Sequence, residues 1–198
     1  MFNGKVQYSG IITQVIPISS EDVQISVHVD GINYDDLKVG DIMLHNGCSL
    51  TVAKINSDSY QILIYGQTLA CTVGLNQVGT ILNIEKSLKI GDQLAGNFVT
   101  GFVDGVAVVA NITIVGECKL VTFELAPELH KYLVRKSAIV VNGVSLTIND
   151  INNNCFIVNL GPNTLQSTNL NLLQTHSQVN IEIDPIAKYV YQFIDLAK

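Results

Sequence analysis

The sequence predicts an all-β protein of two tandem, homologous domains, each a β-sandwich or a small barrel. The first observation is an internal repeat: IMLHNGCSLTV at 42–52 returns as AIVVNGVSLTI at 138–148, 96 residues later. Residues 42–72 and 138–168 align without a gap and share ten identities in 31 positions. The second observation is that short β-branched segments alternate with turn residues in both halves, without helical periodicity between them. Short strands that recur this often are typical of sandwiches and small barrels.

Turn residues such as Asn-Gly, Asp-Gly and Gly-Asp separate the expected strands. In the first half we expect strands at 23–29, 42–45, 49–55, 60–65 and 80–86. In the second half we expect strands at 106–115, 119–125, 138–142, 145–150, 156–160 and 179–183. A short helical turn is expected before each copy of the repeat, at 34–37 and at 127–133.

Two further motifs define the boundary between the halves. FNGKV at 2–6 returns as VTGFV at 99–103, and NIE at 83–85 returns at 180–182, both 97 residues later. The linker must lie between the first NIE strand and the second opening motif, within 89–96. The predicted domains are therefore 1–95 and 96–183, each within the usual size range of a domain.

The last residues, 184–198, predict an amphipathic helix. Asp184 is a good N-cap, and Pro185 suits the first helical turn. Apolar residues then recur at helical spacing, at Ile186, Tyr189, Val190, Phe193 and Ala197. Such a helix either packs on its own domains or docks on another subunit.

The composition is that of a folded globular protein, with 47% hydrophobic and 14% charged residues. The net charge of −6, with no basic cluster longer than Arg135-Lys136, argues against nucleic acid as a partner. No apolar run approaches a membrane span, and the N-terminus lacks the features of a signal peptide. We therefore expect a cytoplasmic protein without membrane partners.

The cysteines and histidines do not predict a metal site. Four cysteines lack any CxxC pair, so we expect buried free thiols. No histidine has a neighbour at metal-ligand spacing, so we expect all four on the surface or in turns.

The repeated motif places two hydroxyl groups on one face of a strand in each half. Ser49 and Thr51 project together, as do Ser145 and Thr147, because residues two apart in a strand share a face. Such a pair can bind a polar heterocycle, although the motif alone favours the simpler interpretation, in which these are ordinary Ser and Thr residues on a solvated strand face. In each half a segment that follows a strand, 66–68 and 161–164, is expected to form a loop that can line a pocket, although turn chemistry alone also explains the Gly and Pro there.

Five segments in order resemble the riboflavin synthase family, whose repeat binds lumazine, across the whole chain. They are MFNG at the N-terminus, HNGCSLTV, GNFVTGFVDG, VNGVSLTI and NIEIDPIAKYV. The resemblance implies tandem six-stranded Greek-key barrels followed by a C-terminal α-helix. It also implies pockets for 6,7-dimethyl-8-ribityllumazine or a flavin. The family's enzyme makes riboflavin by moving a four-carbon unit between two lumazines, one per barrel, that meet across a subunit interface.

Several residues match the family's ligand-binding positions. The first-barrel matches are Ser49, Thr51, Gly66, Gln67 and Thr68. The second-barrel matches are Ser145, Thr147, Gly161 and Thr164. Phe2 and Asp184 match further active-site positions, although the N-cap role already accounts for Asp184.

Three departures point away from catalysis. The family's GGHxxSGH segment reads AGNFVTGF here, so Asn97 and Phe102 replace both histidines. Ser49 stands at the position of the active-site cysteine. These changes remove groups that transfer protons near neutral pH and weaken any nucleophile.

The altered segment resembles the family's non-catalytic branch, the lumazine and yellow fluorescent proteins, which serve bacterial luciferase as optical antennae. We therefore expect a monomer without catalytic residues that holds one lumazine, riboflavin or FMN non-covalently. Its site would lie in the first barrel, closed by Gly101, Phe102 and Val103. The alternative is a divergent riboflavin synthase that assembles as a trimer, and a flavin-storage protein is a further possibility.

Overall fold

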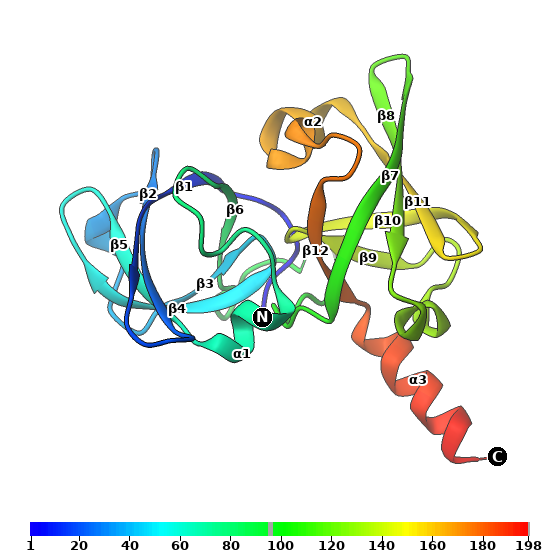
Figure 1. Cartoon of the computed structure of the whole chain (residues 1–198), viewed down its shortest axis with the longest axis horizontal. Coiled ribbons are helices and arrows are strands. Elements are labelled where there is room, and N and C mark those ends of the chain that lie inside the picture. Colours follow the sequence, from blue (N-terminus) through cyan, green and yellow to red (C-terminus); the bar gives the residue numbers. More distant parts are fainter. Residues whose placement is uncertain (95–96, 198) are drawn as a thin grey trace.

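The computed structural model describes residues 1–94 and 97–197 and contains two closed antiparallel β-barrels side by side, with a helix projecting from the second (Figure 1). The first barrel comprises β1 (Tyr8–Pro17), β2 (Val23–Val29), β3 (Ile42–His45), β4 (Cys48–Ile55), β5 (Tyr60–Ile64) and β6 (Ile81–Lys86). The second comprises β7 (Gly105–Val115), β8 (Cys118–Leu125), β9 (Ala138–Val141), β10 (Val144–Asn152), β11 (Cys155–Leu160) and β12 (Gln178–Ile183). The prediction of tandem six-stranded barrels is confirmed.

The two barrels share one topology. The strand order is β1-β2-β5-β4-β3-β6 in the first and, in corresponding order, β7-β8-β11-β10-β9-β12 in the second. The register shifts between Val52 and Lys54 in β4, and between Ile148 and Asp150 at the equivalent place in β10. A bulge of this kind bends a strand, and its recurrence shows that the repeat extends to backbone geometry.

Short helices connect the strands. They are η1 (Tyr34–Asp36), α1 (Gly66–Cys71), η2 (Pro127–Tyr132), α2 (Pro162–Ser167) and η3 (Asn169–Leu172). The expected turns before each copy of the repeat are η1 and η2. The segments that were expected as loops, 66–68 and 161–164, instead contribute to α1 and α2. β1 was not expected from the sequence.

Each barrel has its own apolar core. In β4, Cys48, Leu50 and Val52 are buried while Ser49 and Thr51 are not, which confirms the predicted alternation. In the second barrel, the rings of Phe123 and Phe156 stack with centroids 5.2 Å apart. The two cores are separate clusters of buried residues, one in each barrel.

The expectation of a surface histidine is wrong for His45, which is fully buried in the first barrel. Its Nδ1 lies 3.1 Å from the Met43 carbonyl and its Nε2 lies 2.8 Å from the Tyr60 hydroxyl. A neutral ring satisfies both contacts by donating to the carbonyl and accepting from the hydroxyl. Burial lowers the pKa of His45 to about 3, so the ring stays neutral at ordinary pH.

The four cysteines are free, but they are not all buried as expected. Cys48 lies in the first core, Cys71 is exposed, and the other two are half-buried.

Two segments cross from one barrel to the other: residues 1–6, the first crossing segment, and residues 97–103, the second crossing segment. Phe2 and Val99 pair between them, with Phe2 N donating to Val99 O at 2.9 Å. Val6 then packs against the core of the second barrel, and Val103 against the core of the first. Each barrel therefore contributes a segment to the other. The predicted boundary between 95 and 96 lies outside the described residues.

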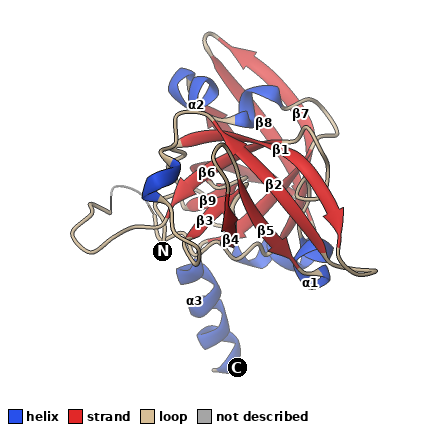
Figure 2. Cartoon of the chain, turned by 90° about the vertical axis from the view of Figure 1, so that its left-hand side faces the viewer, coloured by secondary structure: helices blue, strands red, loops and turns tan. Residues whose placement is uncertain are grey.

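The chain ends in α3 (Pro185–Leu196), as the sequence predicted, although Lys198 lies outside the described residues. Asp184 caps it by accepting from Ile186 N at 2.9 Å. Tyr191 packs edge-on against Tyr132 of η2, whereas Phe193 is 70% exposed. The helix extends away from both barrels (Figure 2). Across residues 1–94 and 97–197, every helix is too short or too polar to cross a membrane.

Candidate functional site

A pocket of about 390 Å³, here called the first pocket, lies on the outer wall of the first barrel. Ser49, Thr51 and Ala53 reach it from β4, on the strand face opposite the core. Its full lining is Ser49, Leu50, Thr51, Ala53, Leu63, Tyr65 and Thr68. The lining thus combines hydroxyl groups with apolar side chains, and the volume of the pocket suits a small molecule.

The second crossing segment lies against the first pocket. Ser49 N donates to Gly101 O at 2.9 Å. Gly101 has φ +81°, and a Cβ there would lie 2.6 Å from the Cβ of Ser49. Only glycine accommodates both the backbone angle and this approach.

The structure brings some of the predicted first-barrel residues together and separates others. Ser49, Thr51 and Thr68 share the first pocket, and Gly101 touches Ser49. The other four do not line this pocket. Gly66 and Gln67 line a neighbouring hollow beside Glu21, Val103 packs against the barrel core, and Phe102 is 69% exposed.

Sequence reasoning missed Leu50, Ala53, Leu63 and Tyr65 in the first pocket. Ala53 could have been found, because it lies two residues after Thr51 and shares its strand face. Tyr65 aligns with Gly161 at the repeat offset of 96, so only the first pocket has an aromatic ring at this place.

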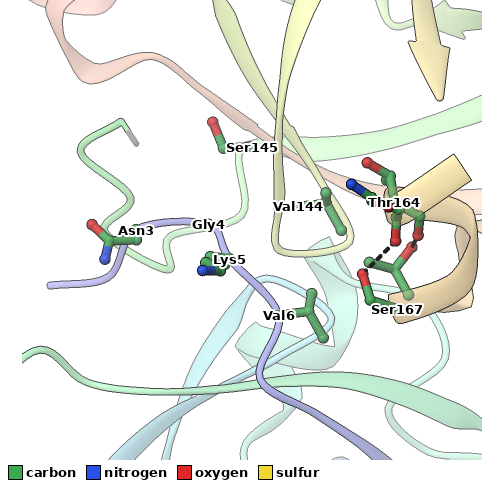
Figure 3. Close-up of a pocket in the computed structure, with 10 residues that line it drawn as sticks. Asn3, Gly4, Lys5, Val6, Val144, Ser145, Thr164 and Ser167 are labelled. Atoms are coloured by element: carbon green, nitrogen blue, oxygen red, sulfur yellow. Dashed lines mark hydrogen bonds between the residues drawn. The ribbon is translucent and has the colours of Figure 1, made fainter. Parts of the chain in front are cut away.

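The second barrel has an equivalent pocket, also of about 390 Å³, here called the second pocket. Residues 3–6 of the first crossing segment form one side, and Thr164 and Ser167 of α2 form another (Figure 3). Ser145 and Thr164 are the predicted residues that line it, while Thr147 and Gly161 do not. The full lining is Asn3, Gly4, Lys5, Val6, Val144, Ser145, Asn163, Thr164, Ser167 and Thr168.

The key serines of the two pockets differ in their hydrogen bonding. Asn97 Nδ2 donates to Ser145 Oγ at 2.5 Å, so the serine hydroxyl of the second pocket already has a hydrogen-bond partner within the protein. Within residues 1–94 and 97–197, no group hydrogen-bonds to the side-chain hydroxyl of Ser49. The first pocket therefore presents a serine hydroxyl that is free for a ligand.

Within the described residues, the first pocket is lined by hydroxyl-bearing and apolar residues, and its lining contains no His, Cys, Asp, Glu or Lys. Cys48 precedes Ser49 but faces the core, where burial raises the pKa of its thiol to about 12. Phe2, a further predicted active-site position, is buried between the barrels, and Asp184 caps α3. The first pocket can bind a ligand through hydrogen bonds and apolar contact.

A family model described as "Lumazine binding domain" matches residues 3–87 and 100–184. Among curated proteins, the riboflavin synthase of Photobacterium phosphoreum is 32% identical over 195 residues, covering 98% of this chain and 89% of the relative. That of Buchnera aphidicola subsp. Schizaphis graminum is 34% identical over 188 residues, covering 89% and 88%.

Solved structures of LumP have the same fold. LumP complexed with riboflavin matches with a TM-score of 0.85 and 31% identity, covering 92% of this chain and 99% of LumP. LumP complexed with flavin mononucleotide matches with a TM-score of 0.80, at the same identity and coverage.

Proposed function

The chain belongs to the lumazine-binding domain family, and from that premise we propose that it is a non-catalytic protein that binds one lumazine or flavin per chain. The binding site is the first pocket, and the ligand is 6,7-dimethyl-8-ribityllumazine, riboflavin or FMN, held non-covalently. The LumP structures with all three compounds support this choice of ligand class.

The observation that carries the proposal is the free hydroxyl set of the first pocket. Ser49, Thr51 and Thr68 can each donate to and accept from a heterocycle that has both ring carbonyls and a ring N–H. Leu63 and Tyr65 supply apolar and aromatic surface for the fused rings. A few placed polar groups within apolar surroundings are the usual composition of a small-molecule site.

The absence of catalysis is supported by the groups at the three altered positions. Asn97 carries an amide, which does not titrate, and its NH₂ donates to Ser145. Phe102 exposes an apolar ring, and Ser49 offers a hydroxyl in place of a thiol. Riboflavin formation needs proton transfers that these groups do not supply.

The finer part of the proposal is that the bound chromophore is an optical antenna that modulates emission by a bacterial luciferase, with the chain acting as a cytoplasmic monomer. It rests on the resemblance of the altered 95–102 segment to the family's antenna branch. The exposed apolar residues of α3, such as Phe193, count against a monomer. Light scattering at micromolar concentration determines the oligomeric state, and a mass of three chains per particle would refute a monomer.

A divergent riboflavin synthase is the second candidate. One observation favours it: the two barrels carry equivalent pockets of about 390 Å³ each, and the reaction consumes two lumazines. The curated relatives above are riboflavin synthases, but their activity is not evidence that this site retains it.

The test is a titration of the purified chain with riboflavin and with 6,7-dimethyl-8-ribityllumazine, followed by ligand fluorescence. We expect saturation at one ligand per chain and no riboflavin produced from lumazine above background. Steady turnover would establish the enzyme, and saturation at two ligands would place binding in both pockets.

A further inference from the structure

We propose that Glu182, a residue of the second barrel, is a positioning residue for the first pocket, because it fixes the crossing segment whose Gly101 lies against Ser49. The inference deepens the proposed function, and it rests on that function for the identity of the ligand. The positioning itself is a property of the chain and can be measured without ligand.

Glu182 lies on β12 and is only 2% exposed. Its Oε1 accepts from Thr100 N and from the Thr100 hydroxyl, both at 2.7 Å, and its Oε2 accepts from Gly101 N at 2.9 Å. All three donors belong to the second crossing segment. Hydrogen bonds to a carboxylate are shorter and stronger than those to a neutral acceptor, so this buried group is an effective clamp.

Gly101 connects Glu182 to the first pocket through two hydrogen bonds. Its N–H binds Glu182 of the second barrel, and its carbonyl accepts from Ser49 N of the first. A single peptide segment thus links a buried carboxylate to the strand that carries the pocket hydroxyls. Because Gly101 lies so close to Ser49 that a Cβ would not fit between them, a shift of Gly101 toward β4 would displace Ser49.

A second anchor limits how the crossing segment can move. Asp104 follows it directly, and its Oδ2 accepts from Ile183 N at 2.8 Å. Lys188 Nζ of α3 donates to both carboxylate oxygens of Asp104 at 2.9 Å. The segment is therefore held by the second barrel at Thr100–Gly101 and again at Asp104.

The internal repeat supplies a matched control. Glu85 occupies the equivalent place on β6, is also 2% exposed, and accepts from Asn3 N at 2.7 Å. The first crossing segment in turn contacts the second pocket, where Ser145 N donates to Gly4 O at 2.9 Å. Each glutamate thus holds the segment that lies against the pocket of the opposite barrel, so their substitutions should affect opposite pockets.

The direct test is hydrogen exchange in the ligand-free chain. Glu182→Gln turns one carboxylate oxygen into an NH₂ group, which faces the N–H of Gly101 or the donors of Thr100. We expect the Ser49 amide to exchange about tenfold faster while the Ser145 amide changes little. Glu85→Gln should produce the opposite pattern. Equal acceleration of both amides in Glu182→Gln would show a purely structural role and overturn the proposal.

The second readout is the dissociation constant for riboflavin. Glu182→Gln should weaken binding about tenfold, whereas Glu85→Gln should leave it within about twofold of the unchanged chain. Thr100→Ser, which keeps the hydroxyl donor, should behave like the unchanged chain, and Thr100→Val should be intermediate. Equal weakening by the two glutamate substitutions would contradict the proposal. Failure of the unchanged chain to bind riboflavin would instead refute the proposed function, and the exchange experiment would still decide the role of Glu182.

Discussion

Gly47 of the first barrel and Gly143 of the second face each other so closely that a Cβ on either would lie 2.8 Å from the backbone nitrogen of the other. Both follow an asparagine with positive φ, Asn46 at 47° and Asn142 at 45°. Such Asn-Gly pairs form the hairpin turns that match strand twist. The repeated motif therefore has a structural role, besides the binding role that we propose for it, because its two turns contact each other where the barrels meet.

Gly47→Ala should destabilise the chain by more than about 1 kcal/mol, because it combines an unfavourable backbone angle with a steric clash. Gly31→Ala is the matched control, since Gly31 has φ +75° but a Cβ added there would meet no atom within 4 Å. Urea unfolding of the two variants separates the cost of the backbone angle, which both share, from the cost of the steric clash, which only Gly47→Ala has. If Gly47→Ala lowers the free energy of unfolding no more than Gly31→Ala does, the close approach of the barrels does not contribute to the cost of the substitution.

Much of the fold followed from the repeat, because a gap-free match of 31 residues requires two domains of one topology. The burial of His45 did not follow. β3 is covered on both faces, by the core at Met43 and by the neighbouring barrel at Leu44, so its sequence lacks the alternation that marks an exposed side.

The candidate site was predicted best where it lies on a strand. Ser49 and Thr51 follow from a period of two, which is reliable once the strand is identified. Gln67 and Thr68 were grouped as one loop, but they lie in α1, where adjacent residues point about 100° apart. Only Thr68 therefore faces the first pocket.

His45 should make the stability of the chain depend on pH. Its pKa is about 3 in the folded chain and about 6.5 when unfolded, so the unfolded chain binds the extra proton between these values. Its contribution to stability is complete above pH 6.5 and is lost as the pH falls toward 3, by up to about 1.4 kcal/mol per pH unit.

The measurement compares urea unfolding of the unchanged chain and of His45→Gln at pH 6.5 and pH 5. The unchanged chain should lose about 1.6 kcal/mol more than the variant over this interval. Burial raises the pKa of Glu85 and of Glu182, so their contributions are complete below about pH 4.5 and fall as pH rises through the folded values. These opposing effects are common to both proteins and cancel in the comparison. Parallel losses in the two proteins would contradict a buried neutral histidine.

Thr51→Val should weaken riboflavin binding by roughly twofold to tenfold, because it removes one hydroxyl of the first pocket while keeping the side-chain shape. Thr147→Val is the control in the other barrel and should have little effect, since Thr147 lies outside the second pocket. Both residues are exposed on equivalent strands, so the two substitutions should cost similar stability. A larger loss of affinity from Thr147→Val than from Thr51→Val would contradict the assignment of the binding site to the first pocket.

Tyr65 is an aromatic side chain of the first pocket that has no counterpart in the second barrel, because Gly161 occupies the equivalent position of the repeat. A ring that packs against a fused heterocycle contributes about 0.5–1.5 kcal/mol, so Tyr65→Ala should weaken riboflavin binding by roughly twofold to tenfold. Tyr65→Phe keeps the ring and should retain most of the affinity. Tyr189→Ala is the control, because Tyr189 on α3 is 67% exposed, close to the 63% of Tyr65, but does not line the pocket. Affinities measured by ligand fluorescence that fall equally in both alanine variants, or not at all in Tyr65→Ala, would show that the ring has no part in binding.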